Sequence, residues 1–237
     1  KTVIHYTLEL IDTIVAIRYD SCITGIDLKD IFSSKETVRE EIKDLEGQLI
    51  IKEYPTKSAG VNTIHSHLER LRQRDISPDL IIVDYADLLR AKSPNDEKRH
   101  QLESIYESLR GLAQEFKCPM WTASQTNRSG LNAEVVTMES ISEAFNKCFV
   151  ADFIFSLSRT VEDKQSNTGR FFVAKNRNGP DGLVFPVSMT TANVQIKILP
   201  STGEEQRALS TRDQSEVLKE KYKKFRDNKK KKTEGEQ

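Results

Sequence analysis

The chain has 237 residues, of which 37% are hydrophobic and 30% charged, and its formal net charge is zero. This length can bury one sizeable core, and no apolar run approaches the roughly 18 residues of a membrane span, so a spanning protein is excluded. The balanced charge excludes a globally basic nucleic-acid-binding protein, so contacts with nucleic acid would have to come from local loops or a tail.

The first third of the chain alternates between strand and helix patterns. Its expected strands are residues 2–7 and 49–52, and a polar loop follows at 54–60. Three helices are expected from apolar residues at helical spacing: Leu10, Ile14 and Ile17; Val38, Ile42 and Leu45; and Val61, Ile64, Leu68 and Leu71. Strands that alternate with helices favour a mostly parallel sheet covered on both faces.

A buried strand that ends in an acid is the most informative segment. Four apolar residues run from Leu80 to Val83 and are followed by Asp84 and Tyr85. Open α/β sheets bind ligands where strands leave the sheet, and a carboxylate there can hold the Mg²⁺ of a nucleoside triphosphate, usually through water. Many buried strands end in Asp, so this segment alone does not decide the function.

The second half contains the clearest helix, over residues 102–116, and then a strand at 118–123 that ends at Ser124 and Gln125. A polar loop (126–136) and a helix near 138–148 are expected to follow it. Later strands are expected at 152–157, 171–174, 183–189 and 194–199, the middle two joined by a turn. These last strands predict an antiparallel edge on the sheet.

The composition changes beyond Pro200. Residues 219–232 carry nine Lys and Arg against only Glu220 and Asp227. We therefore expect one folded domain over residues 1–200 and a charged, largely disordered tail over 201–237.

Two polar residues at expected strand ends are candidates for catalysis. Glu9 follows the first strand, where a carboxylate can orient or deprotonate an attacking water. On position alone, a solvated Glu at a helix start is the more common case. Gln125 can donate to a phosphate oxygen while accepting from water, although a lone Gln more often only closes a strand.

Two cations, Lys175 and Arg177, lie two residues apart and so face the same side of a strand, before the turn Asn178-Gly179-Pro180. They could hold phosphoryl charge, which Arg does as a fork. They could instead protect an exposed edge strand.

Taken together, these segments resemble the RecA-like motor domain of hexameric replicative helicases of the DnaB type, including phage versions, over about residues 1–190. The resemblance rests on five motifs in the family's order, of which the last is the most distinctive: Thr7-Leu8-Glu9-Leu10, Ile81 to Tyr85, Ser124-Gln125-Thr126-Asn127-Arg128, Ala151-Asp152 and Lys175 to Pro180. It implies a P-loop NTPase core with a mostly parallel central sheet.

The resemblance also implies residue roles, with ATP and Mg²⁺ as cofactors. Glu9 would activate water, Asp84 would hold Mg²⁺ through water, and Gln125 would sense the γ-phosphate. Lys175 and Arg177 would reach the nucleotide of a neighbouring subunit. The loop beginning at Thr126, Asn127, Arg128, Ser129 and Gly130 would contact single-stranded DNA in the central channel of a homo-hexamer, without base readout.

The chain departs from the family pattern in two places. It contains no phosphate loop of the form GxxxxGK[ST], and residues 138–150 match the family wording only loosely. We expect the loop to lie upstream of Lys1, in sequence missing from this chain, and we expect the chain alone to be inactive.

The sequence therefore predicts an ATP-dependent replicative DNA helicase motor that unwinds duplex DNA as a ring, with primase and a helicase loader as further candidate partners and no membrane partner. A RecA-type recombinase, which would form filaments, and a catalytically degenerate helicase-like adaptor remain open alternatives. Three distant cysteines without zinc or redox spacing favour a reducing cytoplasm, bacterial or phage-infected.

Overall fold

The computed structural model describes residues 1–93, 96–126, 135–138 and 146–200. The strands in these residues are β1 (Thr2–Thr7), β2 (Gln48–Glu53), β3 (Leu80–Asp84), β4 (Met120–Thr122), β5 (Phe153–Ser158), β6 (Thr168–Asn176), β7 (Val184–Thr190) and β8 (Gln195–Ile198). The helices are α1 (Asp12–Thr24), α2 (Lys35–Ile42), α3 (Val61–Arg72), the 3-10 turn η1 (Ala86–Leu88), α4 (Lys98–Glu115), α5 (Asn146–Val150) and α6 (Val161–Ser166). None of these helices is long and apolar enough to cross a membrane.

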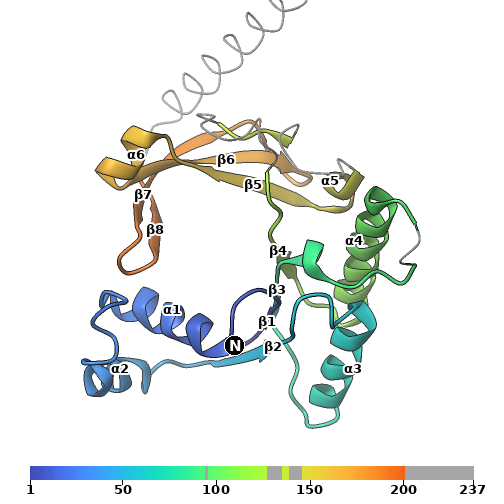
Figure 1. Cartoon of the computed structure of the whole chain (residues 1–237), viewed down its shortest axis with the longest axis horizontal. Coiled ribbons are helices and arrows are strands. Elements are labelled where there is room, and N and C mark those ends of the chain that lie inside the picture. Colours follow the sequence, from blue (N-terminus) through green and yellow to red (C-terminus); the bar gives the residue numbers. More distant parts are fainter. Residues whose placement is uncertain (94–95, 127–134, 139–145, 201–237) are drawn as a thin grey trace, which may run out of the picture.

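Four strands form a parallel sheet in the order β2-β1-β3-β4. Helices lie on both sides of it, with α1 and α2 on one side and α3 and α4 on the other (Figure 1). Along β1 the side chains alternate: Ile4 and Tyr6 enter the core with α3 and α4, whereas His5 meets Tyr19 of α1. The predicted α/β class and the helix-covered parallel sheet are confirmed.

The main core lies between this sheet and the helices α3 and α4. The four apolar residues that mark α3 are all buried there: Val61, Ile64, Leu68 and Leu71. The backbone approaches closely at the start of α3, because a Cβ on Gly60 would lie 3.0 Å from the Arg90 carbonyl oxygen. The position therefore favours glycine.

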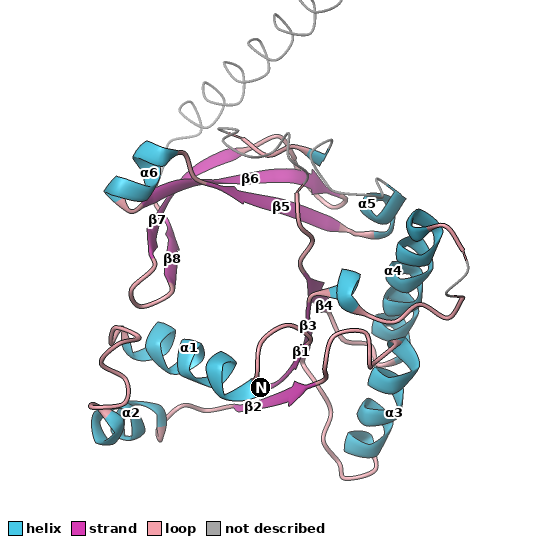
Figure 2. Ribbon diagram, viewed as in Figure 1, coloured by secondary structure: helices cyan, strands magenta, loops and turns pink. Residues whose placement is uncertain are grey.

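The remaining strands form a separate antiparallel sheet in the order β5-β6-β7-β8 (Figure 2). Its strands are joined by contacts between aromatic rings, with Phe155 stacked on Phe171 at 4.7 Å and Phe171 against Phe185 at 6.1 Å. The sequence predicted these strands as the edge of one mixed sheet. The structure differs because β4 and β5 are each the outer strand of their own sheet.

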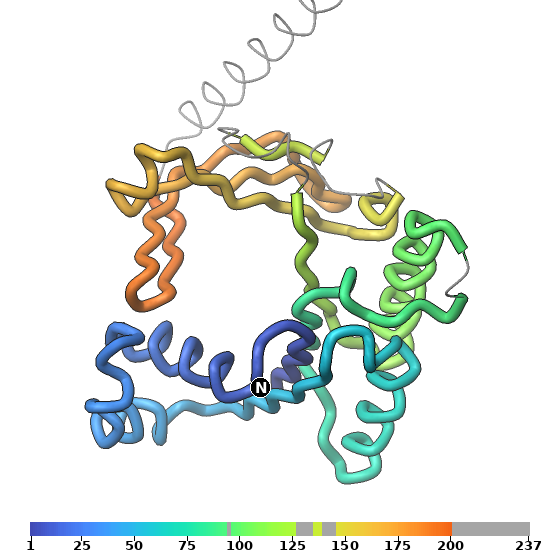
Figure 3. Tube along the Cα trace, in the orientation of Figure 1, coloured from blue at the N-terminus to red at the C-terminus, as the bar shows by residue number. Residues whose placement is uncertain are grey.

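Contacts among the described residues link the antiparallel sheet to the parallel sheet and to the region of α1. Trp121 of β4 and Phe155 of β5 lie 5.8 Å apart between ring centres. At the other end, the turn between β7 and β8 reaches α1 (Figure 3), where Leu28 donates its backbone N–H to the Ala192 carbonyl at 2.8 Å and the Gln195 amide donates to the Cys22 carbonyl at 2.9 Å. The outer strands still expose aromatic surface, since Trp121 is 56% and Phe153 46% exposed.

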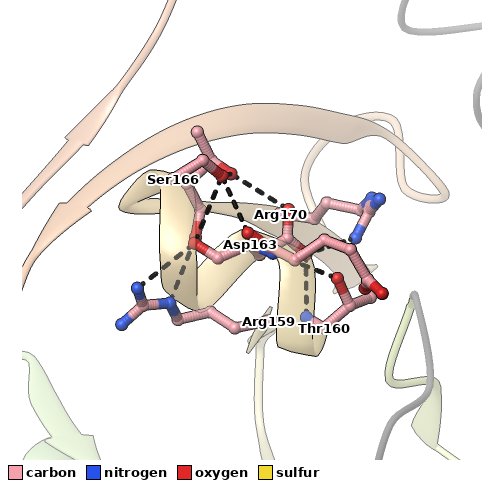
Figure 4. A network of polar contacts seen from close by, with 7 residues as sticks. Arg159, Thr160, Asp163, Ser166 and Arg170 are labelled. Atoms are coloured by element: carbon pink, nitrogen blue, oxygen red, sulfur yellow. Dashed lines mark hydrogen bonds and ion pairs between the residues drawn. The ribbon is translucent and has the colours of Figure 1, made fainter.

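A compact polar network closes the turn between β5 and β6, around α6 (Figure 4). Thr160 caps this helix: its hydroxyl accepts from the Asp163 N–H at 3.2 Å, and the Asp163 carboxylate accepts from the Thr160 N–H at 2.8 Å. Arg170 of β6 donates to the same carboxylate at 2.8 Å. The capping box thus fixes α6 against the strand that follows it.

Some local predictions were wrong. Helix α1 begins at Asp12, beyond Leu10, and it buries Val15 and Ser21, whereas Ile14 is 39% exposed. Helix α2 ends at Ile42, which leaves Leu45 half exposed. The sequence pattern also missed η1 and α6. The predicted tail (201–237) and most of the predicted loop at 126–136 lie outside the described residues, as does the predicted helix before Asn146.

Candidate functional site

Two acids, Glu9 and Asp84, lie at the carboxyl ends of the neighbouring parallel strands β1 and β3. Thr7, the last residue of β1, pairs with Asp84, and the next N–H, of Leu8, donates to the Asp84 carbonyl at 2.9 Å. The buried Thr7 hydroxyl then donates to the Leu10 carbonyl at 2.6 Å, which turns the chain. Glu9 is exposed at this turn. Both acids therefore stand at the sheet edge where ligands of parallel sheets bind.

Asp84 offers oxygen atoms of the kind that Mg²⁺ prefers. Its side chain is 40% exposed and open to water, and a hydrated Mg²⁺ suits one or two carboxylates. The Asp84 carboxylate therefore fits a hydrated magnesium ion. On the protein side, the Nε2 of His5 lies 3.9 Å from the Asp84 carboxylate. Burial lowers the pKa of His5, although Asp84 opposes this effect.

Tyr85 connects this edge to Gln125, a connection that the sequence did not reveal. The Gln125 side-chain amide donates to the Tyr85 hydroxyl at 2.9 Å. Burial raises the pKa of Tyr85, and the negative charges of Glu9, Asp87 and Asp84 raise it further. Tyr85 therefore feels the charge of both acids, and its hydroxyl links Gln125 to this edge of the sheet. The only feature of the sequence that could have indicated this contact is the tyrosine that directly follows Asp84 at the end of the strand.

Asp87, three residues past the strand acid, is a second group that the sequence did not single out. Its carboxylate accepts from Tyr106 at 2.8 Å, from Lys147 at 2.8 Å and from Ser124 at 3.3 Å. Burial, followed by the Asp87 charge, raises the pKa of Tyr106 far above its usual range. Two contacts therefore fix the segment that carries Gln125: Ser124 donates to Asp87, and Gln125 donates to Tyr85.

The two cations lie at a different place. The Lys175 ammonium donates to the carbonyls of Cys148 and Phe149 at 2.9 and 3.2 Å. Arg177 donates to the same Phe149 carbonyl at 3.4 Å and pairs with Asp152 at 2.6 Å. Both side chains reach one acceptor, as expected for residues that face one side, but β6 ends at Asn176 and Arg177 lies just beyond the strand.

The structure therefore brings together three of the predicted site residues: Glu9, Asp84 and Gln125. Among the described residues, the hydrogen bonds and ion pairs of Lys175 and Arg177 go to α5 and Asp152 and not to these three. Thr126 is exposed directly after Gln125. Asn127, Arg128, Ser129 and Gly130, the other candidate DNA contacts, lie outside the described residues.

Residues 1–191 match the model of the DnaB-like helicase C terminal domain. The chain belongs to this family. It is 29% identical over 172 residues to a DnaB-like replicative helicase of Enterobacteria phage T4, an alignment that covers 68% of this chain and 36% of the relative. It is 30% identical over 136 residues to the replicative DNA helicase DnaB of Geobacillus stearothermophilus, covering 54% of this chain and 30% of the relative. The predicted family is confirmed.

Solved structures show the same fold. A DnaB-like replicative helicase, solved for its interactions with primase, superposes with a TM-score of 0.71 at 19% identity, covering 84% of this chain and 52% of that one. A solved ATPase domain gives the same TM-score and identity and is 75% covered. The DnaB-like chain spans only about a third of the length of the curated relatives described above.

Proposed function

We propose that this chain is the motor part of an ATP-dependent replicative DNA helicase, which unwinds duplex DNA by translocating along single-stranded DNA as a homo-hexameric ring. The observation that carries the proposal is the grouping of Glu9, Asp84 and Gln125 at the carboxyl edge of one parallel sheet, in a member of the DnaB-like family. Relatives from bacteria and a phage support a cytoplasmic place of action.

Each side chain at this edge has a distinct task. Glu9, exposed and held at a turn, accepts the proton of the attacking water. Asp84 would hold a hydrated Mg²⁺, which would offset the charge of the ATP phosphates. The Gln125 amide, oriented by Tyr85, hydrogen-bonds to the terminal phosphate and reports its presence to the loop that follows.

Lys175 and Arg177 act on the nucleotide of the neighbouring subunit. Their shared anchor at the Phe149 carbonyl and the Arg177–Asp152 pair hold the two positive charges together, and among the described residues neither cation forms a hydrogen bond or ion pair with Glu9 or Asp84. Arg177 is 47% exposed and can exchange the Asp152 carboxylate for phosphate oxygens when a neighbour approaches. A ring of like subunits provides that neighbour at every site.

The loop that starts at Thr126 contacts DNA. Arg128 neutralises backbone phosphates, and binding is independent of base sequence. Arg128→Ala is expected to weaken single-stranded DNA binding about equally for different sequences and to lower the salt dependence of binding by about one phosphate contact. Primase and a loader remain proposed partners.

The 237 residues contain no GxxxxGK[ST] segment, so a polypeptide of these residues alone is expected to bind ATP weakly and to hydrolyse it slowly or not at all. The decisive experiment therefore uses the complete gene product. Glu9→Gln should abolish ATP-driven unwinding of a forked duplex while leaving ring formation intact.

Glu46→Gln, at an exposed position before β2, is the matched control and should behave as the unsubstituted protein. Unwinding that survives Glu9→Gln would remove Glu9 from the reaction. An unsubstituted gene product that exchanges strands in filaments would favour the recombinase, and one that neither hydrolyses ATP nor unwinds DNA would favour the adaptor.

A further inference from the structure

Lys147 is a buried cation that the proposed mechanism does not use. Its side chain is 2% exposed, and its ammonium donates to the Asp87 carboxylate at 2.8 Å. The same ammonium lies 5.7 Å from the centre of the Tyr106 ring. A charge held out of water is costly unless it is paired, so Lys147 and Asp87 depend on each other for their positions.

Asp87 faces the segment that carries the phosphate-sensing amide. Besides Lys147, it accepts a hydrogen bond from Ser124 at 3.3 Å. Ser124 immediately precedes Gln125, whose amide donates to Tyr85 at 2.9 Å. When Gln125 moves as a phosphate binds or leaves, its neighbour Ser124 moves with it, and Ser124 is hydrogen-bonded to Asp87.

Lys147 lies on the helix that anchors the two cations. Helix α5 has only five residues, and the carbonyls of Cys148 and Phe149 directly follow Lys147 in it. These carbonyls accept from Lys175 at 2.9 and 3.2 Å, and the second also accepts from Arg177 at 3.4 Å. Since a helix this short has few internal hydrogen bonds, its side-chain contacts determine where it sits.

We propose that Asp87 and Lys147 are positioning residues that couple the two ends of this path. When Gln125 responds to phosphate in one subunit, the Asp87–Lys147 pair passes the displacement to α5 and so to Lys175 and Arg177, which serve the next subunit. The inference rests on the proposed function, and it adds a route by which hydrolysis at successive sites of the ring stays in order.

A purely structural pair would behave differently from a coupling pair. Loss of a structural pair weakens the fold, with activity lost in proportion to the unfolded fraction. Loss of a coupling pair lowers kcat in protein that remains folded, because Gln125 and the cations are no longer held in register. Small misplacements of this kind cost about 100-fold in rate.

The test uses the complete gene product and its DNA-stimulated ATP hydrolysis. Lys147→Met, which keeps the apolar stem, is expected to lower kcat by about 10- to 100-fold with KM for ATP changed less than about twofold. Asp87→Asn should do the same, and the double variant should be no worse than the more impaired single variant. Lys197→Met, an exposed residue of β8, is the control and should change neither constant.

Coupling is read from two further double-mutant cycles. Adding Lys147→Met to an Arg177→Ala background, or to a Gln125→Ala background, should cost less than about threefold, because the far end of the path is already lost. Full additivity in both backgrounds, or an unchanged kcat in the Lys147→Met protein, would overturn the coupling.

Hydrogen exchange of the same proteins separates this inference from the proposed function. Lys147→Met should speed amide exchange both at residues 123–126 and at 148–152, with residues 61–72 of α3 unchanged. If the unsubstituted protein lacks ATPase activity, the proposed function fails, yet this paired increase still supports the mechanical link. An increase in neither segment, or throughout the protein, overturns the link.

Discussion

The parallel and antiparallel sheets differ in which side chains stabilise them and in how deeply those side chains are buried. The parallel sheet shares a core of aliphatic side chains with α3 and α4, and residues such as Ile64 and Leu68 are fully buried in it. The antiparallel sheet buries fewer aliphatic side chains, Val173, Val184 and Val187, and adds partly exposed aromatic rings and polar caps such as the one at Thr160.

This difference matches what each sheet carries. The acids and the sensing amide stand at or just beyond the ends of parallel-sheet strands, where the buried core supports their arrangement. The two cations stand at the end of β6 in the antiparallel sheet, where the Arg177 side chain is 47% exposed and accessible to a neighbour. In the proposed ring, the parallel sheet thus holds the chemistry of its own subunit, and the antiparallel sheet serves the next one.

The largest predicted effect tests this contrast in stability. Leu68→Ala, at a fully buried site of α3, should lower the free energy of unfolding by about 2–5 kcal/mol, because it leaves a cavity in the main core. Leu157→Ala on β5, where the side chain is 38% exposed, should cost less than about 1.5 kcal/mol. Denaturant unfolding measures both. Equal losses would contradict the contrast.

Tyr85→Phe tests whether the parallel sheet arranges its own site. The substitution removes the hydroxyl that accepts from Gln125, and kcat of DNA-stimulated ATP hydrolysis by the complete gene product should fall about tenfold with the fold intact. Tyr54→Phe is the control, since Tyr54 stacks on Tyr6 within the core. A normal kcat in Tyr85→Phe would show that Gln125 is positioned by other contacts.

A smaller effect is expected from the cap of α6. Thr160→Ala removes the hydroxyl that accepts from the Asp163 N–H, and should lower the free energy of unfolding by about 1 kcal/mol. Thr160→Ser keeps the hydroxyl and should retain most of the stability. If the alanine variant melts at the unchanged temperature, the polar network of Figure 4 does not hold the antiparallel sheet.

The smallest effect concerns pH. Burial lowers the pKa of His67, and the charges of Arg70, Lys52 and Arg74 lower it further, while its Nδ1 shares a hydrogen bond with the Tyr6 hydroxyl. The unfolded chain therefore binds more protons near pH 6, so this histidine favours folding above its unfolded pKa of about 6.5 and less below it.

The free energy of unfolding of the parallel-sheet core should therefore decline as the pH falls from 7.5 to 5.5, and His67→Asn should reduce that decline. The difference between the two proteins across this range isolates the histidine from other titrating groups. A difference that stays constant with pH would contradict the lowered pKa.

The sequence predicted the parallel sheet well because its signals are local. An apolar run that ends in Asp84, and apolar residues at helical spacing in α3 and α4, need no tertiary information to be read. The separation of the two sheets depends on whether β4 and β5 pair, and no local pattern encodes that choice.

The site residues divide in the same way. Glu9, Asp84 and Gln125 could be found at strand ends, and their grouping follows from parallel strands sharing one edge. The sequence could not indicate the pair of Asp87 and Lys147, because 60 positions separate them and only the fold brings them into contact. Long-range polar pairs of this kind become visible only in three dimensions.

The outer strands β4 and β5 have a consequence for handling the protein. Within the part of the chain that the structure describes, each has a neighbouring strand of its own sheet on one side alone, and the rings of Trp121 and Phe153 on these strands are exposed. Such edges are templates for aggregation, since another copy can add a strand and cover the rings. A preparation of these 237 residues should therefore form soluble oligomers or precipitate as its concentration rises, and Trp121→Lys should delay that onset.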